Sequence, residues 1–540
     1  MFVFYDTETT GIAMDYTQIL QIGLLFTDVD LNVLSSKKID CRNSPWTLPS
    51  PGALLTTGFT PDDVKNSKNS NFEMMKELDD WLRMKHWPLV FLGYNSIPYD
   101  EPVLEQNFYQ NLLPHDLTTS GNDKNNQMNG RADVMRMVQM VSIYMPAALK
   151  LDILNYYGSP SVSLKNVAQQ NGVDLSDDDA HDALNDIKAT VGVAKLIKKA
   201  APQIWDLAIK LSTVGGVEEF LEDNTLFTTA KMGRNKEIKS NVLTDLTPQK
   251  DSATREALFD VRVDPTPYLN MTVAQLKDVL LGEAGAPQNP FLVVEKDKEP
   301  ALVPMDLSDP VLTDEDDEAV FKARAKKLKA DKAFLAKVAK ATALAHEEKL
   351  AAIPSPGALE RQMDKSMPAS VKAKLDTWAQ EFRDAADWKA RAQLVSGFRT
   401  RFKNELAKDP SLDRFVKIAG RLVYEHAPEE ISAAQQEGMK KFIAARLLNP
   451  DLDVPYMTIA KARKELQTIE WQRKKKDDTK WTEVTDTDIR RLKLYYTAIE
   501  KEYEKYSPYD KKPDTPANSN TPPNTAKKTS NGFNRNSPKP

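Results

Sequence analysis

Hydrophobic residues in the first 200 positions occur in short runs and in longer stretches with helical spacing. Apolar runs rich in Val, Ile, Leu and Phe predict strands at residues 2–5, 19–26, 33–39 and 89–92. Helices are predicted at residues 72–84 and 183–199, together with others that carry Val103, Val134 and Val167. Strands followed by helices that cover a sheet indicate an α/β fold with a three-layer core.

The pattern changes beyond residue 201. Apolar runs at residues 257–264 and 289–297, separated by Gly and Pro turns, predict a small β region. Residues 313–350 are rich in helix formers, so we expect one amphipathic helix there. Its apolar stripe comprises Phe321, Leu328, Phe334, Val338 and Leu344. Residues 356–506 are almost wholly helical in composition, and domains are therefore predicted at residues 1–201, 202–355 and 356–506.

The last segment, residues 507–540, consists mainly of Pro, Asn, Thr, Ser and Lys. Few apolar residues are present to offset the entropy lost on ordering, so a disordered tail is expected. The six basic residues of this tail outnumber its two acidic residues. Contact with nucleic acid is one interpretation of this excess, and a solubilising role is the stronger one.

Composition narrows the class of protein. A chain of 540 residues with 41% hydrophobic residues is long enough for several cores. Its single cysteine, Cys41, cannot form an internal disulfide or a thiolate cage. No apolar run approaches the roughly 20 residues that span a bilayer, and the N-terminus begins directly with a short strand. We expect a monomeric, cytoplasmic protein without membrane contact.

Two acids close the first predicted strand, in the segment FVFYDTETTG. Side chains in a strand alternate with period two, so Asp6 and Glu8 project to one face and Thr7 to the other. Two carboxylates about 4 Å apart repel by on the order of 4 kcal/mol at an effective dielectric near 20. Asp100 and Asp186 add to the charge, so protons or cations must neutralise the cluster. Oxygen ligands of this kind suit Mg²⁺ or Mn²⁺.

A histidine accompanies the last of these acids, in the segment AHDALNDIKAT. Asp186 follows His181 by five residues, which places the two side chains about 140° apart on one helix. They would then flank a groove, with Asp186 binding metal and His181 accepting a proton from the attacking water. Histidine suits this role because its unperturbed pKa is about 6.5.

Each of these patterns also has an ordinary interpretation. With 78 acids in the chain, chance alone gives about eleven acid-x-acid pairs, so Asp6 and Glu8 could be solvated residues at a strand end. Asp100 could cap the helix predicted at residues 101–112. His181 could be a surface residue after three consecutive aspartates. The order of the three segments along the chain favours the catalytic interpretation.

The three segments FVFYDTETTG, GYNSIPYDE and AHDALNDIKAT resemble the exonuclease motifs of the DnaQ-like 3′→5′ exonuclease superfamily, in the DEDDh version with a histidine in the third motif. PSPGALLTTGFTPDDV and ADVMR further resemble the bacterial exonuclease I family, and this likeness covers roughly residues 1–210. It implies a ribonuclease H-like core, an SH3-like small β region and a helical C-terminal domain. It also implies hydrolysis of single-stranded DNA to 5′-mononucleotides with two metal ions, Mg²⁺ or Mn²⁺. The implied catalytic residues are Asp6, Glu8, Asp100, His181 and Asp186, and all but His181 would hold metal.

The same resemblance places Thr7, Thr9, Asn95 and Arg136 against the terminal nucleotides. Among these residues, Arg136 has the clearest physical reason for its role, because its planar guanidinium suits a phosphate. In one departure, Ser163 stands where members of the family carry an arginine, with Lys165 nearby. The family's partner, the tail of single-strand DNA-binding protein, is a possible partner here, although its basic binding residues have no clear counterparts.

The net charge of −5 means that any nucleic acid must bind in a local groove. The basic runs at residues 322–329 and 473–476 could line this groove, although each is more often a solvated helix face. Tyr94, Tyr99 and Tyr109 are candidates for base stacking, whereas Phe108 is expected in the core. Two other functions remain open: an RNA-trimming or proofreading exonuclease of the same superfamily, and a non-catalytic single-strand DNA-binding protein.

Overall fold

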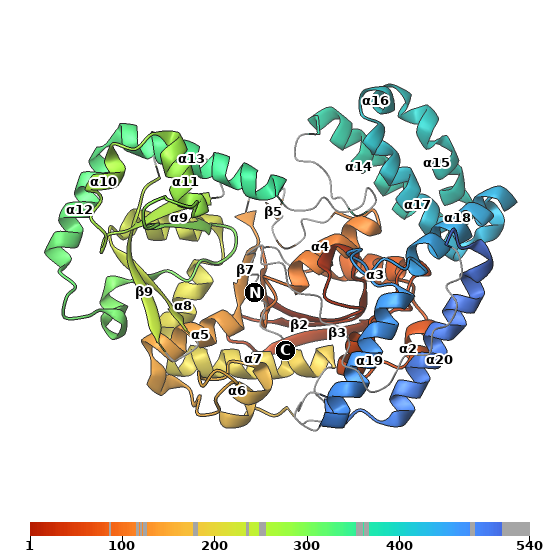
Figure 1. Ribbon diagram of the computed structural model, residues 1–540, viewed down its shortest axis with the longest axis horizontal. Helices are drawn as coiled ribbons and strands as arrows, with labels where there is room; N and C mark the ends of the chain where they lie inside the picture. The colour runs from red at the N-terminus through yellow and green to blue at the C-terminus, as the bar shows by residue number, and fades with distance from the viewer. Residues whose placement is uncertain are drawn as a thin grey trace.

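The computed structural model describes residues 1–85, 88–114, 118, 121–122, 127–175, 182–233, 237–247, 255–352, 360, 367–475 and 481–509. A central α/β body lies between two lobes, one coloured green and the other cyan to blue (Figure 1). His181 and residues 510–540 of the predicted tail lie outside the described residues. Within the described residues, no helix combines the length and apolar composition that a membrane crossing requires.

The central body contains a five-stranded sheet with the order β3-β2-β1-β4-β7. Its strands are β1 (Phe2–Thr9), β2 (Ile19–Thr27), β3 (Val33–Asp40), β4 (Val90–Gly93) and β7 (Gly130–Asp133). β1, β2 and β3 are antiparallel neighbours, whereas β4 runs parallel to both β1 and β7. The four predicted strands are confirmed, and β1 extends far enough to include both of its acids. β7 was not predicted, because GRAD carries no apolar alternation.

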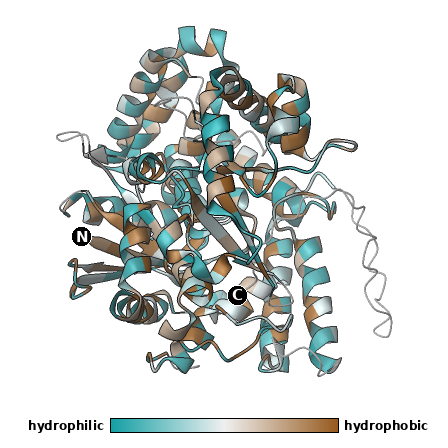
Figure 2. Cartoon of the chain, turned by 90° about the vertical axis from the view of Figure 1, so that its left-hand side faces the viewer, coloured by the Kyte–Doolittle hydropathy of each residue, from teal (hydrophilic) through white to brown (hydrophobic). Residues whose placement is uncertain are grey.

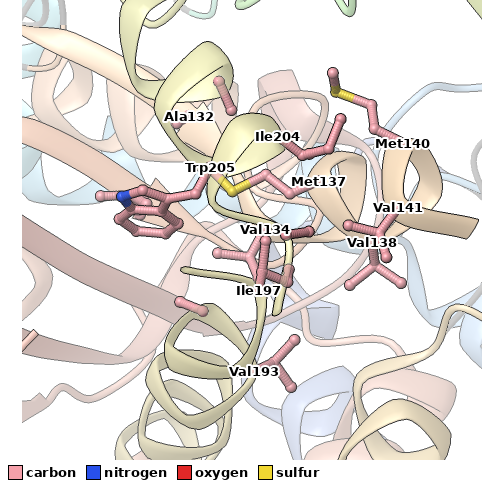
Figure 3. Packing of buried hydrophobic residues seen from close by; sticks show 14 of the residues in the cluster. Ala132, Val134, Met137, Val138, Met140, Val141, Val193, Ile197, Ile204 and Trp205 are labelled. Carbon is pink, nitrogen blue, oxygen red and sulfur yellow. The ribbon is translucent and has the colours of Figure 1, made fainter. Parts of the chain in front are cut away.

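The alternation of β1 divides the body into layers. Phe2 and Phe4 pack in a core with α5 (Val134–Tyr144), α7 (Ala183–Ala200) and α8 (Pro202–Lys210), part of which Figure 3 shows around Trp205. Val3 and Tyr5 pack on the other face with α3 (Asn71–Arg83) and α4 (Asp100–Gln110). The three-layer prediction is therefore confirmed. The remaining helices of this region are α1 (Pro51–Thr57), α2 (Pro61–Asn66) and α6 (Leu164–Gln170).

The expected small β region is a second five-stranded sheet, with the order β11-β10-β9-β8-β12 and antiparallel pairing throughout. The strands are β8 (Phe227–Met232), β9 (Ile238–Asp245), β10 (Arg255–Asp260), β11 (Phe291–Glu295) and β12 (Val303–Pro304). Three helices accompany it, α9 (Val214–Asp223), α10 (Thr266–Leu269) and α11 (Val273–Leu281). This sheet and its helices form the green lobe of Figure 1.

The prediction of a single amphipathic helix at residues 313–350 is wrong in one respect. The structure contains two helices, α12 (Glu318–Ala330) and α13 (Lys332–Ala351). The helix is interrupted at Asp331. The side chain of this residue accepts a hydrogen bond from the Phe334 backbone and so caps the start of the second helix. Four residues of the predicted stripe are buried, whereas Leu344 is 38% exposed, because it follows Val338 by six residues and so lies on another face of α13.

Helices make up the C-terminal part of the described chain, as predicted. They are α14 (Ala369–Asp384), α15 (Trp388–Arg401), α16 (Lys403–Lys408), α17 (Asp413–His426), α18 (Ala433–Leu447), α19 (Ile459–Lys475) and α20 (Asp486–Tyr503). Peripheral helices carry hydrophilic and hydrophobic stripes (Figure 2). Their apolar residues join cores that also include Phe72 and Leu54 of the central body. The C-terminal helices are therefore packed directly against the central body.

Candidate active site

Two of the predicted acids lie near the end of β1, on the face that packs against α7. Asp6 and Glu8 continue the alternation of Phe2 and Phe4, so their carboxylates face that helix. Asp6 pairs with Gly23 of β2, and Glu8 pairs with Gln21. Both neighbouring positions belong to a buried strand, which shields the two acids to different degrees. Glu8 is buried at 7% exposure, whereas Asp6 is half-buried.

The third acid, Asp186, comes from the first turn of α7. Asp182 caps this helix by accepting hydrogen bonds from the backbone of Leu184 and Asn185, and it pairs with Lys38 of β3 at 2.7 Å. The side-chain oxygen of Gln21 accepts a hydrogen bond from the Ala183 backbone at 2.9 Å. These contacts from β2 and β3 fix the start of the helix over the sheet.

Gly23 permits the close approach of α7. A Cβ atom at this position would lie 2.7 Å from Ile187 Cδ1 and 2.9 Å from the Ala183 backbone oxygen, closer than real Cβ contacts. Glycine is therefore required where the helix crosses β2. Gly23 and Gln21 were not among the predicted site residues. A glycine inside an otherwise apolar strand was the available indication of a close backbone approach.

Asp6, Glu8 and Asp186 form a compact group. One ligand oxygen from each lies within 4.8 Å of the others. One buried and two half-buried carboxylates at this separation fit a divalent cation, since hard oxygen donors are the ligands that Mg²⁺, Mn²⁺ and Ca²⁺ prefer. This geometry matches the predicted convergence of the first and third segments.

Asp100 approaches from the opposite layer, at the start of α4. Thr7, which faces that layer, donates a hydrogen bond to the Asp100 carboxylate. Asp100 is not part of the compact group, but its charge acts on both Asp6 and Glu8. The four predicted acids therefore converge at the end of β1 from both faces of the sheet.

Burial and mutual repulsion control the protonation of this cluster. Burial raises the pKa of Asp6 well above its ordinary value, and the charges of Asp100 and Asp186 raise it further. The pKa of Glu8 is raised by burial and then by Asp6 and Asp186. Burial raises the pKa of Asp100 to about 7, with the hydrogen bond from Thr7 opposing the shift. The metal-free cluster consequently holds protons that a cation would displace.

The predicted substrate-binding residues have contacts within the protein. The Thr7 hydroxyl is engaged by Asp100, and the Thr9 hydroxyl lies 2.6 Å from the Tyr99 hydroxyl. Asn95 adopts a left-handed backbone with φ of 63°, and its N–H donates to Asp133 at 2.8 Å. Thr7 and Thr9 lie on the strand that carries Asp6 and Glu8, and the contact of all three residues with nucleotides stays a prediction.

Arg136 has a different environment from the one expected of a phosphate clamp. Its guanidinium donates to the backbone oxygen of Lys298 at 2.5 Å and to that of Glu299. It also lies 3.8 Å from the Glu299 carboxylate. These contacts direct Arg136 toward the second sheet and favour a structural role.

Several other residues that were predicted to contact nucleic acid make contacts within the protein. Phe108 is fully buried as expected, but Tyr109 is also buried at 2% exposure, so it cannot stack on a base. The Tyr94 hydroxyl donates to the Val162 backbone. In the basic runs, Lys322 pairs with Glu318 at 2.6 Å and Arg473 pairs with Asp486. These ion pairs favour the interpretation as helix faces for both runs.

Comparison with known proteins adds an independent observation. A family model described as exonuclease matches residues 3–194, which contain all three acidic segments. Residues 3–194 are therefore similar to the exonuclease family. This similarity implies dependence on a divalent metal, which agrees with the acidic cluster of Asp6, Glu8 and Asp186. His181 falls inside the match but outside the described residues, so its role stays a prediction.

The same part of the chain is similar in sequence to two bacterial proteins named exodeoxyribonuclease I. That of Buchnera aphidicola subsp. Schizaphis graminum is 31% identical over 211 residues, which are 39% of this chain and 42% of that protein. That of Escherichia coli K12 is 28% identical over 206 residues, 38% of this chain and 41% of that protein. The sequence match thus spans less than half of each relative.

Similarity of fold extends much further along the chain. The structure of exonuclease I from Methylocaldum szegediense matches with a TM-score of 0.71 at 18% identity, covering 92% of this chain and 99% of that one. An E. coli exonuclease I structure with a dA16 oligonucleotide matches with a TM-score of 0.67 at 19% identity, covering the same shares. The predicted fold, an exonuclease core with a small β region and C-terminal helices, is confirmed.

Proposed function

We propose that this chain is a 3′→5′ exodeoxyribonuclease that degrades single-stranded DNA to 5′-mononucleotides. The observation that carries the proposal is the convergence of Asp6, Glu8 and Asp186, with Asp100 beside them, inside an exonuclease-family domain. Support also comes from relatives named exodeoxyribonuclease I and from a similar fold in exonuclease I structures.

The acidic residues supply the metal-binding part of the site. Asp6, Glu8, Asp100 and Asp186 would hold two ions, Mg²⁺ or Mn²⁺, between the two layers of helices. Bound ions would offset the charge of the cluster and polarise the scissile phosphodiester. Thr7 orients Asp100 through its hydroxyl, and Gly23 and Gln21 orient Asp186 through the first turn of α7.

The remaining roles concern the proton and the substrate. His181 would accept the proton of the attacking water, a task suited to an imidazole near neutral pH. Thr9 and Tyr99 form a hydrogen-bonded pair beside the acids that would shape the pocket for the 3′-terminal nucleotide. Asn95 would contribute from the turn that precedes α4.

Single-stranded DNA is the proposed substrate, and single-strand DNA-binding protein is a proposed partner. A similar solved structure is an ExoI/SSB-Ct complex, with 18% identity and a TM-score of 0.68. For this chain, a pull-down with the C-terminal peptide of single-strand DNA-binding protein tests the contact. Retention of the chain by the peptide supports the partnership, and equal retention by a scrambled peptide overturns it.

The direction of degradation tests the proposed activity. Purified protein is incubated with a single-stranded oligonucleotide labelled at the 3′ or the 5′ end, with Mg²⁺, with Mn²⁺ and with chelator. We expect the 3′ label to appear at once as mononucleotide, whereas the 5′-labelled strand shortens progressively. Release of mononucleotide from the 5′ label first would overturn the proposal. Asp6→Asn is the inactive control, and Asp30→Asn, at an exposed acid of the same domain, is the active one.

The same assay separates the alternatives. Faster degradation of RNA than of single-stranded DNA would indicate an RNA-trimming enzyme, and preference for mismatched duplex ends would indicate proofreading. Binding of the oligonucleotide without cleavage under any metal condition would indicate a non-catalytic DNA-binding protein.

A further inference from the structure

A turn of the second sheet reaches into the central body beside the second acidic segment. Residues 296–299 directly follow β11 of the second sheet. Lys296 Nζ lies 2.8 Å from carboxylate oxygens of both Glu218 and Glu256, and its side chain is 3% exposed. The base of the turn is therefore held by the ion pairs of a buried lysine.

Glu299, the last residue of the turn, combines a strained backbone with a buried carboxylate. Its φ is 44°, in the left-handed region that residues other than glycine rarely adopt, and it is 1% exposed. One carboxylate oxygen accepts a hydrogen bond from the Asp133 backbone at 2.8 Å. The other oxygen is buried and has no hydrogen-bond partner among the described residues. A strained and incompletely satisfied buried acid is costly, which points to a functional reason for it.

Asp133 connects Glu299 to the second acidic segment. It is the last residue of β7, the edge strand of the first sheet. Its carboxylate accepts hydrogen bonds from the backbone of Met135 at 3.0 Å and of Asn95 at 2.8 Å. Asn95 lies in the turn that leads from β4 to Asp100 at the start of α4. The contacts thus run from Glu299 through Asp133 to the loop that carries Asp100.

A second set of contacts runs beside the first. Asp297 lies 3.5 Å from Arg131 of β7, and Arg131 in turn lies 2.9 Å from Glu101. Arg131 and Glu101 are both buried, and Glu101 is the neighbour of Asp100. Arg136 holds the turn in place by donating to the backbone oxygens of Lys298 and Glu299. Two residues of the turn therefore contact two residues of β7, each of which contacts the second acidic segment.

We infer that the turn of residues 296–299 positions Asp100 for metal binding, with Glu299 as the central positioning residue. The inference rests on the proposed function, because it assigns Asp100 to the metal site. It gives the second sheet a role in assembling the acidic cluster. It also accounts for Arg136, whose guanidinium braces the turn. Groups that orient metal ligands typically change metal affinity or activity by about 10- to 100-fold when mutated.

The test measures Mn²⁺ binding to the full chain by electron paramagnetic resonance, together with single-strand DNA hydrolysis. In Glu299→Ala, we expect Mn²⁺ affinity to fall by about tenfold. We also expect kcat to fall by a similar factor, with the KM for the oligonucleotide unchanged. Glu283→Ala, at an exposed acid of the same lobe, should match the wild type.

A merely structural role gives a different result. If Glu299→Ala lowers the melting temperature but keeps the wild-type Mn²⁺ affinity and kcat, the inference is overturned. If that variant does not fold, Asp297→Asn replaces it, with the same expected fall in Mn²⁺ affinity and the same overturning result. Wild-type protein that binds Mn²⁺ but cleaves no DNA contradicts the proposed function alone, because the Mn²⁺ affinities of the variants still test the positioning role.

Discussion

The hydroxyl of Thr7 donates a hydrogen bond to the carboxylate of Asp100, a residue 93 positions further along the chain. This bond connects the first acidic segment to the second across the end of β1. Thr7 lies between Asp6 and Glu8 but faces the opposite layer. A single strand therefore presents two acids to one side and orients a third acid on the other.

Loss of this hydrogen bond should weaken metal binding. Thr7→Val keeps the shape of the side chain but not the hydroxyl. The pKa of Asp100 should rise further in this variant, because the hydrogen bond that lowers it in the wild type is lost. Mn²⁺ affinity at pH 7 should fall by about tenfold, as for other groups that orient metal ligands. Thr7→Ser is the matched control and should retain affinity. Equal affinities in Thr7→Val and the wild type would exclude this role of the bond.

Removal of one carboxylate should lower activity but raise the stability of the metal-free protein. Asp6→Asn should lower kcat by on the order of a thousandfold, because a metal site supplies several kcal/mol of charge stabilisation. Without metal, the same variant should melt about 2 °C or more above the wild type, since a buried carboxyl with a raised pKa costs stability at neutral pH whether it is protonated or ionised. Thermal shift with and without Mn²⁺ measures both effects. A variant that melts lower and gains stability from Mn²⁺ as the wild type does would contradict the assignment.

Close packing of α7 should be sensitive to a single methyl group. In Gly23→Ala, the added Cβ would meet Ala183 and Ile187 at less than 3.0 Å, so the first turn of the helix must move. We expect Mn²⁺ affinity to fall by about tenfold, together with a loss of stability of about 1–3 kcal/mol, typical of overpacking. Gly215→Ala, where a Cβ meets nothing within 4 Å, is the control. Isothermal titration with Mn²⁺ and chemical unfolding measure the two effects, and an unchanged Gly23→Ala would show that the helix is not fixed at this point.

The raised pKa values predict a particular dependence on pH. Asp100 ordinarily titrates near 3.8 but has a pKa of about 7 in the folded protein, and Asp6 and Glu8 are shifted in the same direction. Between these values the folded state holds more protons than the unfolded state. The free energy of unfolding of the metal-free protein should therefore fall as pH rises from about 4 to 7, by about 1.4 kcal/mol per unit for each proton involved.

Metal binding should show the opposite trend, because a cation must displace those protons. Mn²⁺ affinity should rise through neutral pH and level off above it. Calorimetric titrations at pH 6, 7 and 8 measure this trend. An affinity that is flat across this range would show that the cluster is already ionised without metal.

Local sequence patterns predicted the parts of the fold in which periodicity and burial agree. β1 and β2 are apolar runs that became buried strands, and α7 follows the helical spacing of its apolar residues. β7 could not be predicted in this way, because it is stabilised by pairing with β4 and by the Arg131–Glu101 ion pair, which are contacts between distant segments. The break between α12 and α13 depended on one capping residue, Asp331.

The candidate site also combines residues that local patterns could predict with residues whose roles depend on distant contacts. Asp6 and Glu8 could be placed together from the period of a strand, and the order of the segments suggested Asp186 and Asp100. The contribution of Gly23 and Gln21 depends on where α7 crosses β2, which no local pattern specifies. Arg136 suits a phosphate by its chemistry, but its Nη1 donates to the backbone oxygens of Lys298 and Glu299, a contact between distant segments that no local pattern specifies.

The central claim is that acids from three distant segments form one metal site. Anomalous diffraction from a crystal soaked in Mn²⁺ tests it most directly. We expect a peak that contacts carboxylate oxygens of Asp6, Glu8 and Asp186 and lies beside Asp100, and no such peak in Asp6→Asn. Mn²⁺ peaks only elsewhere on the molecule, with these four carboxylates bare, would contradict the claim.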